Sequence, residues 1–154
     1  MACAVTFQPR MNNRIDGFKV VGKIHSRQWN GIIADLTEVR CTHYAGGYYV
    51  AQDPRLFILL DVEGDDRPLV KMTANGAALP HDPYQRPISY VPAGMDLWVD
   101  VIGVRYMRHL DLHFDAQTLL QRLGEDLDPR RLAEPRLLFS DPRIVALGQL
   151  IATE

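Results

Sequence analysis

The sequence predicts one mainly β domain, a sandwich or barrel, with two or three helices appended after the strands. Apolar runs of strand length follow one another up to about residue 114, and turn-forming residues separate them at short intervals. Helical spacing of apolar residues appears only after residue 115. With 154 residues and 47% apolar content, the chain has room for one hydrophobic core rather than two. We therefore expect a single domain in which strands precede helices.

The first half of the chain has the patterns of strands and turns. In residues 32–37, Ile32, Ala34 and Leu36 alternate with Ile33, Asp35 and Thr37, as in a strand with one strongly buried face. The run "RLFILLDV" at 55–62 is continuously apolar, and the turn formers "EGDDRP" at 63–68 separate it from "LVKMTANG". We therefore expect a hairpin whose turn lies at 63–68.

A Pro-x-Gly corner stands in the stretch "ISYVPAGMDLW" at 88–98. Proline has a fixed φ and no N–H, so it suits a strand end, and Gly94 permits a left-handed backbone. Two further strand-like runs follow, "LWVDVIGVRYM" at 97–107 and "RHLDLHF" at 108–114. The corner is therefore expected to turn the chain from one sheet to the next.

Two helices are expected near the C-terminus. The first begins after Asp115, a good N-cap residue, and ends at Gly124. The second begins at Asp141 and Pro142, a cap followed by a first-turn proline. Its apolar residues at helical spacing are Ile144, Val145, Leu147, Leu150 and Ile151.

Charge, cysteine content and hydropathy narrow the class of protein. The formal net charge is −2 and no Lys/Arg run is present, so this chain has no general attraction for nucleic acid. Cys3 and Cys41 are far apart, which argues against a structural disulfide and for a reducing compartment. No stretch resembles a signal peptide or approaches the roughly 20 apolar residues that span a bilayer. We expect a cytoplasmic protein with no membrane partner.

The corner at 90–94 and the order of strands resemble the cupin barrels. Metal-binding cupins place a histidine three residues after the glycine of this motif, where this chain has Leu97. They also carry a His-x-His pair and a glutamate on earlier strands, whereas His43 has no histidine two residues away. The sequence therefore resembles a cupin without the cupin metal, and we expect no metal and no cofactor.

Over its whole length the chain resembles more narrowly the N-terminal sensing and dimerisation domain of AraC-type transcription regulators. The matching segments are "SRQWNGI" at 26–32, "YVPAG" at 90–94 and the closing pattern "LDLHFDAQTLLQRL…LFSDPRIVALGQLIATE" at 110–154. The resemblance implies a cupin-like jelly-roll barrel, a small organic effector inside it and a homodimer. In that family two helix-turn-helix motifs follow, so we expect DNA binding only through a C-terminal domain absent from this chain.

We divide the chain into an N-terminal arm at 1–18, a cupin-like barrel at 19–114 and a helical dimerisation segment at 115–154. The arm shows no clear strand periodicity, and we expect it to fold over the opening of the barrel when ligand is bound. The helices either cap the barrel or form the interface. The dimer interface candidates are Leu119, Leu120, Leu123, Leu147 and Ile151.

Several polar and aromatic residues are candidates for a pocket that binds a sugar or an aromatic compound. The ligand-binding candidates are His43, Tyr49, Tyr90, Asp96, Trp98 and Arg105. Tyrosines offer a stacking surface with a polar tip, although those near His43 also suit a loop packed on the barrel mouth. Arg105 interrupts an apolar strand, so it needs a ligand anion or a salt-bridge partner. Trp29 is expected in the core, and Trp98 near the barrel mouth.

The motif "HLDLH" places His109, Asp111 and His113 on one face of a strand, which is a plausible set of metal ligands. The opposite face carries Leu110, Leu112 and Phe114. Because this apolar face is expected to be the buried one, we expect the polar triplet to point to solvent.

No catalytic motif stands out. The segments "GDDRP" and "NGAALP" lack the spacing of a phosphate-binding loop, and no G-x-S-x-G elbow is present. We therefore expect a ligand-sensing domain rather than an enzyme. The alternative is a stand-alone metal-dependent cupin enzyme, a dioxygenase or isomerase, which needs histidines inside the barrel.

Overall fold

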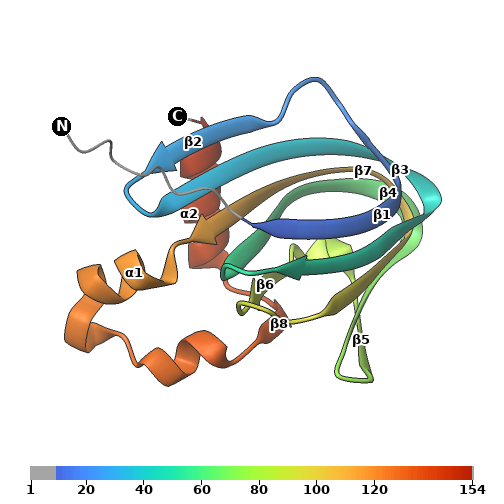
Figure 1. The fold of residues 1–154 in the computed structure, drawn as a ribbon. Helices are drawn as coiled ribbons and strands as arrows, with labels where there is room; N and C mark the ends of the chain where they lie inside the picture. Colours follow the sequence, from blue (N-terminus) through green and yellow to red (C-terminus); the bar gives the residue numbers. More distant parts are fainter. Residues whose placement is uncertain (1–9, 154) are drawn as a thin grey trace.

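Three long strands form the framework of the fold: β3 (Ile32–Ala51), β4 (Arg55–Ala74) and β7 (Leu97–Phe114). The structure is a computed structural model in which residues 10–153 are described. Strand β7 lies between β3 and β4 and pairs antiparallel with both. Figure 1 shows these strands running side by side and bending round at one end of the molecule, so that each contributes to two facing layers.

Shorter strands extend this framework. They are β1 (Met11–Val20), β2 (His25–Trp29), β5 (Ala77–His81), β6 (Ile88–Val91) and β8 (Arg136–Phe139). The order is β1-β3-β7-β4-β6-β8, with β2 paired to β3 and β5 paired to β4, and every pair is antiparallel. The prediction of a mainly β fold with two C-terminal helices is confirmed.

Glycines mark the bend of the long strands. Gly103 has a φ of +74°, and a Cβ on Gly64 would lie 2.4 Å from the carbonyl oxygen of Gly103. Here the pairing of β4 with β7 shifts, and residues 65–68 bulge out of the ladder. The predicted hairpin turn at 63–68 was therefore wrong, because the residues on either side of it belong to one bent strand. The turn formers interrupt the pairing without reversing the chain.

A hydrophobic cluster lies on each side of the layer of the sheet that the C-terminal helix covers. The inner cluster faces the space within the bend and includes Val39, Leu59, Val70, Met72, Val99, Val101 and Met107. The outer cluster includes Ala34, Ile58, Leu60, Ile88 and Leu110. Helix α2 (Pro142–Thr153) packs on the outer cluster through Ile144, Val145 and Ile151. This layer is thus covered on both faces.

The corner and the helices follow the sequence closely. At the corner between β6 and β7, Gly94 has a φ of +76° and its N–H donates to the carbonyl of Ala51 at 2.7 Å. Helix α1 (Ala116–Leu123) starts after Asp115 and ends at Gly124.

Helix α2 begins at Pro142, after Asp141, whose carboxylate accepts a hydrogen bond from the Arg143 backbone N–H at 2.9 Å. Strand β8 and the short 3-10 turns η2 (Gly124–Asp126) and η3 (Pro129–Ala133) lie between the helices, so 115–154 is not wholly helical. A further turn, η1 (Pro83–Gln85), precedes β6.

The N-terminal segment differs from the expected arm. Strand β1 pairs with β3 and places Ile15 opposite Gly47 and Val20 opposite Val39. Most of 11–18 is therefore part of the sheet, contrary to our expectation, while 1–9 lie outside the described residues. Across 10–153, no helix has the length and apolarity needed to cross a membrane.

Candidate functional site

A cavity of about 300 Å³ lies within the bend of the sheet. Strands β1, β3, β4, β6 and β7 all contribute side chains to its wall. Most of the wall is apolar and includes Val39, Val70, Met72, Val99, Val101 and Met107. Its volume lies at the lower end of the range of about 300–1,000 Å³ that is typical of ligand pockets.

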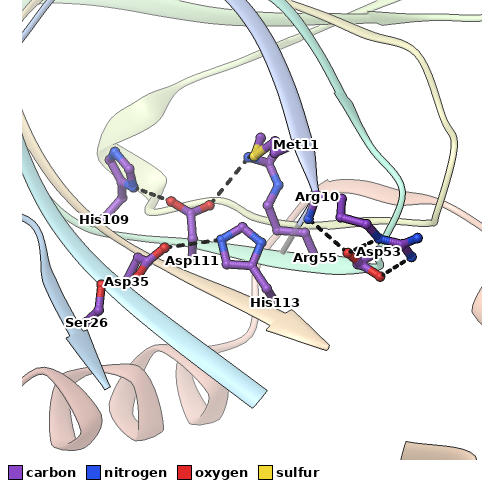
Figure 2. Close-up of polar contacts among 9 residues, drawn as sticks. All are labelled: Arg10, Met11, Ser26, Asp35, Asp53, Arg55, His109, Asp111 and His113. Atoms are coloured by element: carbon purple, nitrogen blue, oxygen red, sulfur yellow. Dashed lines mark hydrogen bonds and ion pairs between the residues drawn. The ribbon is translucent and has the colours of Figure 1, made fainter. Parts of the chain in front are cut away.

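One part of the wall carries the polar cluster, which we define as Arg55, His109, Asp111 and His113. Residues 109, 111 and 113 alternate along β7 and so share a face, and Arg55 on β4 is the cross-strand partner of His113. Figure 2 shows the four side chains gathered together. The residues Arg55, Asp111 and His113 are 7%, 8% and 4% exposed.

The expectation that "HLDLH" points to solvent was therefore wrong. The opposite face is also buried, because Leu110 belongs to the outer cluster and Leu112 packs against it. Helix α2 covers that cluster and shields the apolar face of β7 from solvent. This face is therefore buried on the outside of the bend. The polar face then lines the cavity.

Asp111 contacts His109 and Arg55, and His113 contacts a second carboxylate. The Asp111 Oδ2 atom lies 3.0 Å from His109 Nδ1, and Asp111 Oδ1 lies 3.6 Å from Arg55 Nη1. His113 Nε2 lies 3.4 Å from Oδ2 of Asp35 on β3, and Asp35 also accepts a hydrogen bond from the Ser26 hydroxyl. Figure 2 shows two separate sets of contacts, one that joins Arg55 and His109 through Asp111 and one that joins His113 to Asp35.

These contacts keep the carboxylates ionised. Burial alone raises the pKa of Asp111, but the attraction of His109, Arg55 and His113 outweighs it and holds the pKa at about 2. The contact with His113 lowers the pKa of Asp35, and the Ser26 hydroxyl adds to this effect. The cavity wall therefore carries fixed negative charge beside the Arg55 guanidinium.

The polar cluster has unmet hydrogen-bonding capacity. In the part of the chain that the structure describes, the buried side-chain nitrogen and oxygen atoms without a hydrogen bond are Arg55 Nε, His109 Nδ1, Asp111 Oδ1 and His113 Nδ1. The contacts of His109 and Arg55 with Asp111 are ion pairs that lack hydrogen-bond distance or angle. Each such atom costs roughly 1–3 kcal/mol, so a bound partner would relieve a substantial penalty.

The cavity edge near Arg55 is made by the start of β1. The Arg10 guanidinium donates to both carboxylate oxygens of Asp53, at 2.9 and 3.3 Å, and its backbone N–H adds a bond of 3.0 Å. Burial raises the pKa of Asp53, but these bonds outweigh it and lower the pKa below its usual value. The next residue, Met11, places its sulfur 3.9 Å from Arg55 Nη1.

Tyr49 is the sequence-predicted candidate that the structure places in this cavity. The Arg55 guanidinium lies over its ring, 5.5 Å from the centroid. Burial raises the pKa of the Tyr49 phenol to about 12, so the group stays protonated and keeps its hydrogen-bond donor.

The other candidates lie outside the cavity. His43 and Arg105 are exposed and both approach Asp65, at 3.7 and 3.2 Å, so Arg105 has the salt-bridge partner that we named as the alternative to a ligand. Tyr90 donates its hydroxyl hydrogen to the carbonyl of Leu132 at 2.8 Å. Their role in binding stays a prediction.

Asp96, just before β7, and Trp98, on β7, are both exposed. Asp96 accepts a hydrogen bond from the Tyr48 hydroxyl at 2.6 Å, and the indole N–H of Trp98 donates to Asp100 at 3.0 Å. Trp98 is 49% exposed. Trp29 is 42% exposed, so its expected place in the core was wrong.

The helical candidates divide between packing and exposure. Ile151 packs on the outer cluster, and Leu119 and Leu120 are half-buried. Leu123 and Leu147 are exposed, the latter by 60%. Whether these side chains meet a second copy stays a prediction.

Among the described residues, no group of three or more His, Cys, Asp and Glu side chains is arranged to hold a metal ion. The polar cluster contains two histidines and a carboxylate, but its arrangement does not meet that requirement.

Comparisons with known proteins give structural likeness only. Neither the protein-family models nor the curated proteins include a match. Among solved structures, the chain is similar to the Cnp3 cupin domain of Schizosaccharomyces pombe, with a TM-score of 0.45, 16% identity, and coverage of 73% of this chain and 74% of that one.

It is also similar to the EutQ protein of Clostridium difficile, with a TM-score of 0.38, 10% identity and coverage of 66% and 68%. A cupin domain from Bordetella pertussis gives a TM-score of 0.39 and 9% identity, with coverage of 72% of this chain and 99% of that chain.

Proposed function

We propose that this protein is a cupin-like sensing domain that binds a small organic molecule in the cavity within its bent sheet. One observation carries the proposal. The cavity of about 300 Å³ has a mostly apolar wall, and one part of that wall holds buried polar side chains with atoms that lack hydrogen-bond partners. Ligand sites combine apolar surface with a few placed polar groups in this way.

Thermal unfolding in the presence of a panel of sugars, aromatic compounds and fatty acids tests this proposal. A ligand that binds only the folded state must raise the melting temperature. The variant Val101→Phe fills the cavity and should abolish the shift. Its control is Ile102→Phe, because adjacent strand residues point to opposite faces. If no compound stabilised the unaltered protein, the sensing role would lose its support.

We further propose that the domain serves an AraC-type transcription regulator as a homodimer. The support is the set of sequence motifs at 26–32, 90–94 and 110–154, together with the exposed Leu147 on α2. Leu147→Glu should shift the sedimentation equilibrium from dimer to monomer. Leu79→Glu, at an exposed leucine on β5, is the matched control. A monomeric unaltered protein would contradict this role.

A metal-dependent enzyme is the second candidate, because His109 and His113 line the cavity. Their arrangement with Asp111 does not fit a metal site, so we derive no reaction step from them. Elemental analysis of purified protein separates the two candidates. A stoichiometric transition metal that is lost in His109→Ala would favour the enzyme over the sensor.

A further inference from the structure

The chemistry of the cavity wall restricts the ligand that the proposed sensing domain takes. The apolar part of the wall comes mainly from β1, β3, β4 and β7 and offers no hydrogen-bond partner to a ligand. A polar group of the ligand must therefore reach the polar cluster or one of the few other polar side chains of the wall, such as Thr37, Tyr49 and Ser89, or it is buried without a partner. A molecule with hydroxyls on every side, such as a sugar, meets this condition poorly.

The unpartnered atoms of the polar cluster suit a group that both donates and accepts. Arg55 Nε is a donor and Asp111 Oδ1 is an acceptor, and both are buried without a hydrogen bond. They belong to adjacent parts of the wall, since Arg55 Nη1 and Asp111 Oδ1 lie 3.6 Å apart. A hydroxyl group can accept from the first atom and donate to the second.

The charges of the polar cluster disfavour an ionised ligand. A ligand carboxylate near Arg55 would also lie near the Asp111 carboxylate, 3.6 Å from the guanidinium, and Asp35 adds a second negative charge to the same wall. A ligand ammonium near Asp111 would face the Arg55 guanidinium. Burial weakens the screening of these repulsions by water, so an uncharged polar group fits best.

We propose that the cavity binds uncharged alcohols or phenols with an apolar body, and that their hydroxyl group lies between Arg55 and Asp111. This inference rests on the proposed function, because it names the ligand class of the same cavity. It narrows the expected effectors from sugars and aromatic compounds to molecules with one polar end.

A matched series of probes tests this assignment by calorimetry at pH 7. The series is 4-propylphenol, its methyl ether 4-propylanisole, 4-propylbenzoate, propylbenzene and arabinose. We expect 4-propylphenol to bind at least about tenfold more tightly than each of the others. It alone combines an apolar body with a neutral hydroxyl that both donates and accepts, whereas arabinose has hydroxyls but no apolar body. Equal affinity for phenol and ether, or tighter binding of the benzoate, would overturn the proposal.

Variants locate the hydroxyl. Arg55→Met, which removes every N–H donor of this side chain, should reduce the preference for phenol over ether to within about threefold, whereas Arg105→Met, at an exposed arginine outside the cavity, should leave it unchanged. A preference that survives Arg55→Met would contradict the placement. If that variant does not fold, the affinity ratio in the unaltered protein decides.

The outcomes separate the two proposals. Equal binding of phenol, ether and propylbenzene, lost in Val101→Phe, would overturn the hydroxyl site and keep the ligand-binding cavity. Failure of every probe and of the wider panel would overturn both.

Discussion

Protonation of Asp111 should make the stability of the protein depend on pH in a defined window. In the folded state its pKa is about 2, against 3.8 for the free group, a difference of nearly two pKa units. At about 1.4 kcal/mol per unit, ionised Asp111 contributes roughly 2 kcal/mol to the free energy of unfolding. Since the folded pKa is depressed, this contribution is complete above about pH 4 and is lost as the pH falls to about 2.

Urea unfolding followed by far-ultraviolet circular dichroism, at pH values from about 6 to about 2.5, measures this effect in the unaltered protein and in Asp111→Asn. Other depressed carboxylates, such as Asp53, titrate in both proteins, so the difference between the two isolates Asp111. The difference in the free energy of unfolding between the unaltered protein and Asp111→Asn should decrease by more than about 1 kcal/mol over this range. A difference that stays constant with pH would refute the assigned electrostatics.

Other perturbations test the packing and the backbone. Leu60→Ala should lower the free energy of unfolding by about 2–5 kcal/mol, because Leu60 is 0% exposed beneath α2, and a urea titration measures this. Gly103→Ala should lower the free energy of unfolding, measured in the same way, by about 1 kcal/mol or more, because the φ of Gly103 is +74°. A loss below about 0.3 kcal/mol would contradict the backbone strain expected at this bend. Partial burial raises the pKa of the Cys41 thiol from 9.0 to about 11. Its alkylation at pH 8 in a Cys3→Ser background should therefore be about a hundredfold slower than that of a free thiol. A rate equal to that of a small-molecule thiol would contradict the raised pKa.

The sequence predicted the local features that depend on single residues. The Pro-x-Gly corner, the N-terminal and C-terminal ends of α1 and the start of α2 are set by the backbone preferences of proline, glycine and aspartate. These preferences act over a few residues, so no knowledge of the distant packing was needed. The turn formers at 63–68 show the limit of such reasoning, since they accommodate a bulge as well as a chain reversal.

The predicted orientation of His109, Asp111 and His113 was wrong because strand alternation defines two faces but does not show which of them lines a cavity. Both faces of β7 are buried near its end, and α2, which decides the matter, lies far along the chain. A signal was nevertheless present. Val99, Val101 and Met107 occupy odd-numbered positions of β7, and the register of β7 with β3 is constant. Because the odd-numbered side chains of β7 point inward from Val99 to Met107, His109, Asp111 and His113 lie on the same inward face.

The three bent strands also determine how this domain can fold. Both layers consist of the two halves of β3, β4 and β7, so neither layer can assemble alone and be joined to the other later. The central strand, β7, comes last of the three in the sequence and pairs mainly with distant residues. Topologies dominated by such non-local pairing fold slowly, in milliseconds to seconds. During synthesis, the framework cannot close until Phe114 has left the ribosome, and the unpaired edges of β3 and β4 stay open to other chains until then.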